Sequence, residues 1–545
     1  MVEDDAFTAP QRLPAWSALA AHARRLASRP LSSLFADDPG RAKRLSLTCD
    51  NPAIPGEPAL VADFSKQALD DAVIADLIQL ARETRLDEGI HCLFTGGKVN
   101  FTEGRAAAHM AMRGSCPPPS GTGANTLAMR AFAFALRDGK LTGSTGKTIR
   151  HLVNIGIGGS DLGPRLVCEA LADLYADGES PRVDFVANID PRDLGAVLDR
   201  SDPTETLFVV SSKSFGTMET LANAEAARQW LRDALGADAD LGAHFAAVSN
   251  EVKAATAFGV RPTRVFPLPD WVGGRYSVWS AIGLPALVAI GGAFDEFLSG
   301  AWAMDEHFRT TPFERNLPLW QALVGLWNTD FLAIETLAAL PYAHALRSFP
   351  AWLQQLEMES NGKHTLRDGS DTYVNTAPIV WGGVGTVGQH AFHQLLYQGT
   401  RRVALDFIVP VGDDDPRQRA LVDNALAQAA ALMAGRSKEA ARAQLAARNL
   451  PAAEIDRLAP HLVSPGNQPS TTLLLPRLDA FHLGALLALY EHKVFAQGWL
   501  WGINPFDQYG VELGKEMARA LAEGLTDAQD ASTARLAGIA EGLRQ

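Results

Sequence analysis

The chain has 545 residues, more than a single hydrophobic core usually organises, so we expect two or more domains. Hydrophobic residues make up 47% and charged residues 20%, which is an ordinary balance for a globular protein. The net charge of −13 at pH 7 argues against a nucleic-acid partner, although it leaves room for a local basic pocket.

No part of the sequence indicates export or a membrane partner. Residues 1–5 are acidic and have no apolar core, so we expect no secretory signal. The most apolar segment, residues 280–294, is shorter than the ~20 residues of a membrane helix and contains Gly and Pro, so we predict a buried helix there. No pair of the four cysteines has the spacing of a zinc or redox motif: Cys49, Cys92, Cys116 and Cys168. We therefore expect a cytoplasmic protein.

The first part of the chain, residues 1–115, is predicted to be mainly helical, with a clear apolar helical pattern at 69–84. From about residue 148, short apolar runs alternate with helical segments. The strands are expected at 149–157, 183–189, 207–210 and 245–248. One helix is expected at 164–175, a second begins at residue 190, and a third follows the loop 211–220 and continues to about residue 235. This alternation predicts a parallel sheet flanked by helices, which binds ligands at the carboxyl ends of its strands.

A second α/β unit is expected from about residue 319. It would hold a helix before Glu359, strands at 377–381 and 403–409, and a helix at 387–398. An Ala-rich helical stretch at 425–448 and an amphipathic helix from about Asp527 complete the chain. We therefore predict α/β domains at 116–300 and 301–515, followed by a helical tail at 516–545.

The stretch 354–363 is the one around which the other candidate residues are organised. It follows the apolar pair Trp352 and Leu353 and ends on Ser, Asn and Gly, which stop helices. Glu359 in this stretch is therefore well placed to face a cleft. A single Glu at a helix end is usually a solvated residue, so its interest depends on the rest of the chain.

Two loops that follow predicted strands suit phosphate. Residues 156–163 are rich in glycine, which lets backbone N–H groups approach an anion at a helix start. A dinucleotide fingerprint would need Gly where Asp161 stands, and a Walker loop would need Lys where Pro164 stands. A tight turn without a ligand would explain this loop equally well.

The second loop gathers hydroxyl groups and one cation between a strand and a helix. Its candidate phosphate ligands are Ser211, Ser212, Lys213, Ser214 and Thr217. Two such loops in one sheet can hold one phosphate between them. The alternative is helix capping by Ser214 or Thr217, which needs only one of these residues.

Three further positions carry candidate acid–base or cationic groups. Arg275 follows two glycines and would suit a developing anionic oxygen, or it would form a surface ion pair. His390 and His393 lie one helical turn apart without the Glu of the zinc pattern, so we predict no metal; His390 would shuttle protons or be a buried structural residue. Lys515 ends an aromatic-rich segment, although surface exposure is the usual fate of Lys.

Taken together, these motifs resemble the glucose-6-phosphate isomerase (phosphoglucose isomerase) family from about Gly97 to Lys515. The match is less specific over the first ~90 residues, but several independent motifs in the family's order make chance implausible. The segments that carry the resemblance are Val99–Arg105, Gly156–Pro164, Ser212–Phe215, Gly273–Ser277, Met358–Lys363, Gly388–Phe392 and Gly498–Lys515.

The resemblance implies an α/β fold with two SIS-type, flavodoxin-like domains, each with a parallel sheet flanked by helices, plus helical N- and C-terminal segments. It implies reversible isomerisation of D-glucose 6-phosphate and D-fructose 6-phosphate through a cis-enediol(ate), in glycolysis and gluconeogenesis. It also implies a homodimer with a shared active site and no metal or organic cofactor.

The resemblance also implies a role for each matched residue. Glu359 would move a proton between C2 and C1, and Arg275 would stabilise the enediolate. His390, supplied by the other subunit, and Lys515 would serve ring opening, with Glu219 orienting His390. Gln355 and Gln508 would position the sugar. The phosphate would be held by Ser160, Ser212, Lys213, Ser214, Thr217 and the backbone of Gly159.

Some positions depart from the family, and other functions stay open. Gly216, Met218 and Val387 replace the family's usual residues, and Ser214 replaces a frequent Thr, without removing a proposed catalytic group. A broader isomerase that also accepts mannose 6-phosphate is one alternative. A phosphosugar-binding regulatory module is another, but it would need only the two loops. A nucleotide-binding enzyme fits less well, because neither nucleotide fingerprint matches.

Overall fold

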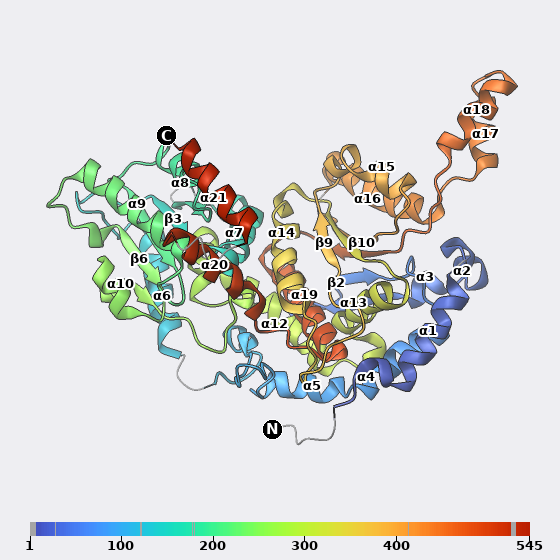
Figure 1. The fold of residues 1–545 in the computed structure, drawn as a ribbon, viewed down its shortest axis with the longest axis horizontal. Helices are drawn as coiled ribbons and strands as arrows, with labels where there is room; N and C mark the ends of the chain where they lie inside the picture. Colours follow the sequence, from blue (N-terminus) through green and yellow to red (C-terminus); the bar gives the residue numbers. More distant parts are fainter. Residues whose placement is uncertain are drawn as a thin grey trace. The chain divides into compact units, whose positions relative to one another are not determined.

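The computed structural model describes residues 7–27, 29–119, 123–176, 178, 180–412, 414–524 and 530–544. The acidic start of the chain and residues 525–529, where the last helix was expected to begin, lie outside these ranges. The chain divides into two compact units, Met1–Pro505 and Phe506–Gln545 (Figure 1). The domain boundaries at 115, 300 and 515 stay predictions.

The first sheet of the larger unit is fully parallel. Its strands are β3 (His151–Ile155), β4 (Arg182–Val186), β5 (Thr206–Ser211), β6 (Phe245–Val248) and β7 (Val265–Phe266), in the order β4-β3-β5-β6-β7. β3, β5 and β6 are buried along their whole length, so they read as mainly apolar runs, and polar residues such as Asn154 in β3 lie within the interior. The strands predicted from about residue 148 are confirmed.

Helices cover both faces of this first sheet. On one face, α8 (Pro191–Leu198), α9 (Met218–Leu235) and α10 (Val252–Phe258) share a hydrophobic core with the strands. On the other, α7 (Leu162–Tyr175) packs against α11 (Leu284–Ile290), and α11 contacts β4. Helix α11 is the buried helix expected within residues 280–294, and it ends at Gly291.

The second sheet is mixed. Its order is β1-β2-β11-β10-β8-β9, formed by β1 (Ser46–Asp50), β2 (Pro58–Asp63), β8 (Thr336–Pro341), β9 (Ile379–Gly382), β10 (Ala404–Pro410) and β11 (Ser470–Leu475). Strands β11, β10, β8 and β9 are parallel, whereas β1 and β2 form an antiparallel pair that joins β11. The parallel sheet expected in the second α/β unit is therefore present, and the N-terminal segment, expected to be mainly helical, adds two antiparallel strands to it.

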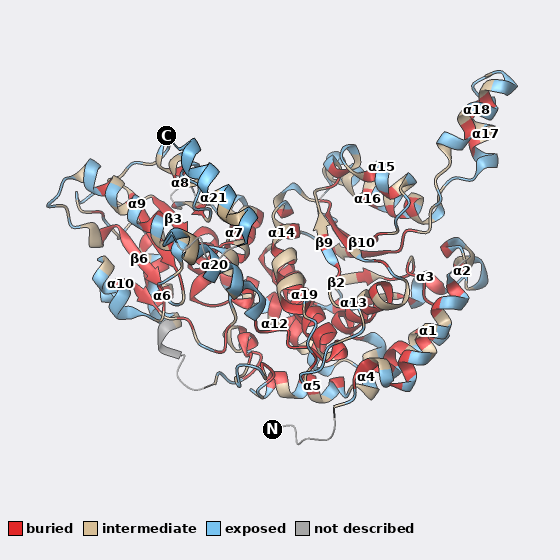
Figure 2. Cartoon of the chain, viewed as in Figure 1, coloured by how far each residue is buried: buried red, intermediate tan, exposed pale blue. Residues whose placement is uncertain are grey.

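A long buried helix forms the interior of the larger unit. Helix α19 (Ala480–Trp501) is buried at nearly every position and packs against α12 (Ala293–Thr310) and α13 (Leu317–Leu326) (Figure 2). A helix buried all round shows no apolar stripe, so periodicity gave no signal for it. The sheets and α19 account for much of the hydrophobic core.

The Ala-rich stretch at 425–448 is two helices and not one. Gly435, at a φ of 69°, ends α16 (Pro416–Ala434), and α17 (Lys438–Ala446) begins after it. With α18 (Ala452–Leu462), α17 forms a helical hairpin that has its own small core and projects from the larger unit (Figure 1).

The described part of the smaller unit includes the α-helices α20 (Glu512–Ala522) and α21 (Ala531–Leu543). None of their residues is buried. The expected C-terminal helix is therefore present.

Candidate active site

Glu359 lies at the end of a short, firmly packed helix. Helix α14 (Phe349–Gln354) continues as the π-helical turn η11 (Gln355–Glu359), a distortion often found at functional sites. Its buried side chains Phe349, Trp352, Leu353 and Leu356 fix the helix on the core. At Gly362, a Cβ atom would lie 2.4 Å from the carbonyl oxygen of Met358, so a larger residue would disturb this helix end.

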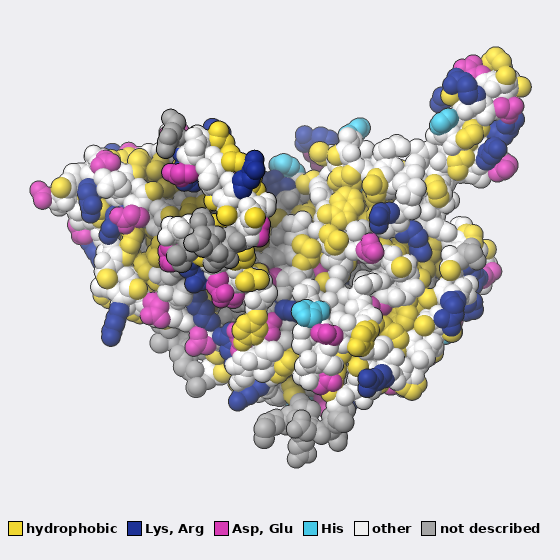
Figure 3. Space-filling view, in the orientation of Figure 1, with side chains coloured by type: hydrophobic (Ala, Val, Ile, Leu, Met, Phe, Trp, Pro, Cys, Tyr) yellow, Lys and Arg dark blue, Asp and Glu magenta, His cyan; other side chains and the backbone are white. Residues whose placement is uncertain are grey.

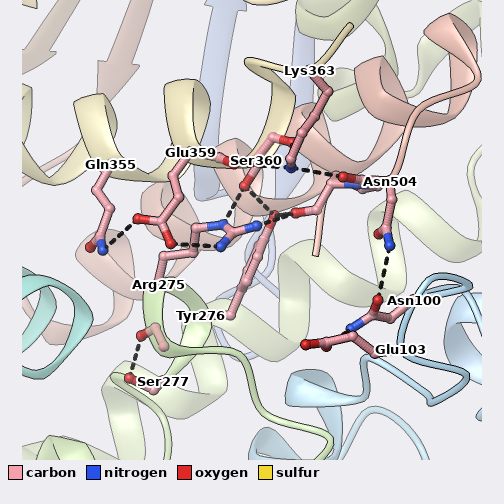
Figure 4. A network of polar contacts seen from close by, with 12 residues as sticks. Asn100, Glu103, Arg275, Tyr276, Ser277, Gln355, Glu359, Ser360, Lys363 and Asn504 are labelled. Carbon is pink, nitrogen blue, oxygen red and sulfur yellow. Dashed lines mark hydrogen bonds and ion pairs between the residues drawn. The ribbon is translucent and has the colours of Figure 1, made fainter. Parts of the chain in front are cut away.

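Both oxygens of the Glu359 carboxylate accept hydrogen bonds (Figure 4). Arg275 Nη1 lies 2.9 Å from Glu359 Oε1, and Gln355 Nε2 donates to Glu359 Oε2 at 2.9 Å. The Arg275 side chain is 1% exposed, whereas that of Glu359 is 26% exposed. The carboxylate is therefore held in place but still accessible to solvent, and the surface ion pair considered for Arg275 is wrong.

Arg275 makes two further contacts that hold its guanidinium in place. Its Nε donates to Ser360 Oγ at 2.6 Å, and its Nη2 donates to the carbonyl oxygen of Pro505 at 2.7 Å (Figure 4). The neighbouring Tyr276 lies with its hydroxyl 3.1 Å from Ser360 Oγ, and its ring stacks on His109 at 4.7 Å between centroids. Burial raises the pKa of Tyr276 to about 12, so its hydroxyl stays protonated.

The glycine-rich loop after β3 lies directly against this group. A Cβ on Gly159 would come within 2.0 Å of the carbonyl oxygen of Gly274, which precedes Arg275. A Cβ on Gly158 would lie 3.0 Å from Gln355 Nε2. The absence of side chains at these two positions is what lets the loop reach both Arg275 and the Glu359 helix.

The two predicted phosphate loops meet at the carboxyl ends of neighbouring strands. Asn154 in β3 bridges them: its Nδ2 donates to the carbonyl oxygen of Ser160 at 2.9 Å, and its Oδ1 accepts from Ser211 Oγ at 2.8 Å. Ser212 Oγ lies 3.1 Å from Thr217 Oγ1. Thr217 precedes α9 without making a side-chain capping hydrogen bond, so capping does not explain this hydroxyl cluster.

Lys213, in the second loop, faces Asp270. Its Nζ lies 3.3 Å from Asp270 Oδ1 and 3.4 Å from the carbonyl oxygen of Asp270. Arg105 Nη1 donates to the same carbonyl at 2.6 Å. Burial and, secondly, the charge of Arg105 hold the pKa of Lys213 below its ordinary value. Ser214, next to Lys213, is exposed.

The predicted ring-opening residues of the larger unit are not joined to this group. His390 is exposed at the end of the turn Val387–His390, and within the described ranges no hydrogen bond or ion pair connects it to Glu359 or Glu219. Glu219 lies partly exposed in the first turn of α9. The buried histidine of the pair is His393, whose pKa is lowered by burial and by the nearby His390.

Gln508 and Lys515 belong to the smaller unit. Gln508 is exposed, and Lys515 forms an ion pair with Glu512 at 2.8 Å. The roles expected for these two residues stay predictions.

Sequence reasoning assigned no role to several residues that hold the site. Ser360, Tyr276 and Lys363 stand inside recognised motifs, and Asn100 and Asn504 lie in two others. The only indication of their role in the sequence was that they lie within these motifs. Among the residues with described positions, no cluster of His, Cys, Asp and Glu suits a metal ion, and no helix is long and apolar enough to span a bilayer.

The fold and site therefore define an α/β protein in which strand-end loops rich in glycine and hydroxyl groups meet a restrained carboxylate. The model of the family described as phosphoglucose isomerase matches residues 63–537. The chain belongs to the phosphoglucose isomerase family.

Individual relatives agree with this family over nearly the whole chain. The glucose-6-phosphate isomerase of Aromatoleum aromaticum is 61% identical over 546 residues, which covers 99% of this chain and 98% of the relative. The glucose-6-phosphate isomerase of Marinomonas sp. is 45% identical and covers 97% of this chain and 98% of its own. The crystal structure of a glucose-6-phosphate isomerase from Chlamydia trachomatis matches with a TM-score of 0.83 at 32% identity, covering 99% of this chain and all of that one.

Proposed function

We propose that this chain catalyses the reversible isomerisation of D-glucose 6-phosphate and D-fructose 6-phosphate. The observation that carries the proposal is the Glu359 carboxylate, held by Arg275 and Gln355 beside the glycine-rich loop. Family membership and 61% identity to a glucose-6-phosphate isomerase support it. An enzyme of this kind would act in the cytoplasm, in glycolysis and gluconeogenesis.

Binding would begin at the two strand-end loops. The hydroxyl groups of Ser160, Ser212, Ser214 and Thr217, the backbone of Gly159 and the ammonium of Lys213 would hold the phosphate. The Ser212–Thr217 contact and the Asn154 bridge support a shared location for the two loops. Because the phosphate takes no part in the bond changes, its binding energy serves to place C1 and C2 of the sugar.

Proton transfer would then use Glu359. Its carboxylate takes the proton from C2 of the open-chain aldose and returns it to C1, and the reverse order converts the ketose. Negative charge develops on the sugar oxygen between the two transfers, and the guanidinium of Arg275 would stabilise it. Gln355, bonded to the same carboxylate, would orient the base and the sugar. These steps need no metal or organic cofactor.

Ring opening would need His390 from a second copy of the chain, oriented by Glu219, together with Lys515 and Gln508. A homodimer is supported by exposed apolar side chains in the stretch 379–395, which contains His390: Ile379, Val387 and Leu395 are 61%, 70% and 48% exposed. Figure 3 shows hydrophobic side chains gathered over β9. The projecting α17–α18 hairpin offers a further surface for a partner.

A coupled assay for glucose 6-phosphate formation from fructose 6-phosphate, with excess chelator, tests the proposal. Wild-type protein is expected to turn over, and Glu359→Gln is expected to lose several orders of magnitude while still binding the sugar phosphate. Binding without turnover by the wild type would indicate a phosphosugar sensor. Full activity in Glu359→Gln would place the base elsewhere. Mannose 6-phosphate, supplied in the same assay, tests whether the enzyme accepts the epimer at C2.

A further inference from the structure

Lys363 closes the motif that contains Glu359, yet its ammonium group is directed at backbone carbonyls. Lys363 Nζ donates to the carbonyl oxygens of Glu359 at 3.1 Å and Ser360 at 2.7 Å, and to that of Asn504 at 3.0 Å (Figure 4). The first two carbonyls belong to the last turn of the helix, where they lack intrahelical partners and where the helix dipole favours a cation. Lys363 therefore fixes the end of the helix from which the Glu359 side chain extends.

The same short segment anchors Arg275. Pro505, which follows Asn504, accepts a hydrogen bond from Arg275 Nη2 at 2.7 Å. Two consecutive carbonyls thus hold the two cations that flank Glu359, one at its backbone and one at its carboxylate. The contacts form a closed ring that runs from the Glu359 carboxylate through Arg275, residues 504–505 and Lys363 back to the Glu359 backbone.

The segment 504–505 is itself held by the turn Val99–Arg105, a family motif with no assigned role. The buried Asn504 side chain donates through Nδ2 to Asn100 Oδ1 at 2.9 Å and to Thr102 Oγ1 at 2.7 Å. At the other end of the turn, Arg105 donates to the carbonyl of Asp270 that also accepts from Lys213. The turn therefore connects the Glu359 helix to the second phosphate loop.

From this arrangement we propose that Lys363 is a positioning residue for proton transfer by Glu359, with Asn504 and the Val99–Arg105 turn as its anchor. The inference rests on the proposed isomerase function. Phosphate fixes one end of the substrate, so the distance from the carboxylate to C1 and C2 depends on how the helix end is tied to the phosphate loop. A displacement of about 1 Å at such a site can cost about 100-fold in rate.

A purely structural role for Lys363 makes a different prediction. Loss of a helix-end cation would lower the fraction of folded protein, but each folded molecule would keep its rate. The experiment must therefore report the rate per competent site. The number of competent sites is counted by calorimetric titration with 5-phospho-D-arabinonate, whose carboxylate resembles the planar enediolate.

The test compares Lys363→Met with wild type for kcat per competent site, KM for fructose 6-phosphate, and the isotope effect with glucose 6-phosphate deuterated at C2. We expect kcat per site to fall by about 100-fold with little change in KM, because the lost interaction acts on the transition state. The isotope effect is expected to be at least as large as in the wild type. Lys363→Arg, which keeps the cation, is expected to recover part of the rate.

Arg41→Met is a matched control. The buried guanidinium of Arg41 also donates to three carbonyls, those of Ser65, Gln67 and Leu69 at 2.6–2.7 Å, but it lies on no element of the site. It is expected to lose folded protein and to keep its rate per site. If Lys363→Met does not fold, Thr102→Val gives the same test in a milder form, because it removes one acceptor of Asn504.

The outcomes separate the two proposals. Absence of turnover in the wild type would overturn the isomerase function itself. Turnover in the wild type with an unchanged kcat per site in Lys363→Met, or an equal loss in Arg41→Met, would overturn the positioning role alone. A loss in Lys363→Met or Thr102→Val that is absent in Arg41→Met supports the positioning role.

Discussion

Replacing Ser360 with Ala tests whether Arg275 needs its hydrogen bond to the Ser360 hydroxyl in order to support catalysis. Ser360 is fully buried, and its hydroxyl accepts from Arg275 Nε at 2.6 Å and lies 3.1 Å from the Tyr276 hydroxyl. The substitution removes one oxygen and leaves the helix backbone unchanged. Arg275 keeps its contacts with Glu359 and Pro505, so the ion pair remains but the guanidinium loses one of the groups that set its orientation.

The expected size of the effect follows from the type of hydrogen bond. A hydrogen bond to a charged group contributes about 1.5–3 kcal/mol, and the buried Nε would be left without this acceptor. Tyr276 retains a longer contact with the Pro505 carbonyl oxygen at 3.5 Å, so its loss is partly compensated. If the loss falls on the transition state, kcat/KM should drop by about 10- to 150-fold.

The assay is the coupled measurement of kcat and KM on Ser360→Ala beside Ser470→Ala. Ser470 is a second buried serine, and its hydroxyl has no hydrogen-bond partner within the described ranges, so its loss should leave both constants unchanged. Wild-type kcat in Ser360→Ala would refute the reasoning that Arg275 needs this support. An equal loss in both variants would assign the effect to core packing.

Three more predictions address the loops and the proposed dimer. Gly159→Ala is expected to abolish most activity, because its Cβ would lie 2.0 Å from the Gly274 carbonyl oxygen. Gly274→Ala is expected to keep its activity, because no atom lies within 4 Å of the added Cβ. Equal circular dichroism of the two variants with unequal kcat would confirm the contrast. If Lys213 binds the phosphate as proposed, it does so in its charged form, so its lowered pKa should bring the loss of binding at high pH below the usual range of lysine. Arg105→Gln removes a neighbouring positive charge and should move the rise of KM to higher pH, and an unmoved KM profile would contradict this. Val387→Asp places a charge on the exposed apolar surface and should convert the proposed dimer to a monomer in sedimentation, with loss of activity. An active monomer would contradict the proposal of a shared active site.

Periodicity and composition predicted the first sheet well and the second only in part. Strands such as β5 and β6 are buried on both faces, so each is a mainly apolar run followed by a helix, and this pattern is local. The antiparallel strand β2 pairs with β11, as in Leu473 with Ala62, across more than 400 residues. No local pattern reports such a partner. The strands β1, β2, β7, β8 and β11 were not predicted.

The same contrast holds within the site. Glu359, Arg275 and Gln355 were chosen from their motifs, and the structure places them in direct contact. Lys363 and Asn504 were passed over because they act through main-chain carbonyls, which every residue carries. Because every residue carries a main-chain carbonyl, a sequence does not show which carbonyls accept a hydrogen bond from a given side chain. Such contacts are identified only from the structure.

Support through the backbone also suits the chemistry that Glu359 would perform. A base that both takes and returns a proton must stay free to change its charge, so its fixed neighbours cannot all bind its carboxylate tightly. In this site the Glu359 side chain keeps part of its surface exposed, while Lys363 holds its main chain and the Pro505 carbonyl oxygen holds the opposing Arg275. The backbone that carries the carboxylate is thereby fixed by contacts that do not involve the carboxylate itself. Lys363 and Arg275 donate to the consecutive carbonyls of Asn504 and Pro505, which lie 141 and 230 residues further along the chain, so a single short segment fixes the base and the cation relative to each other.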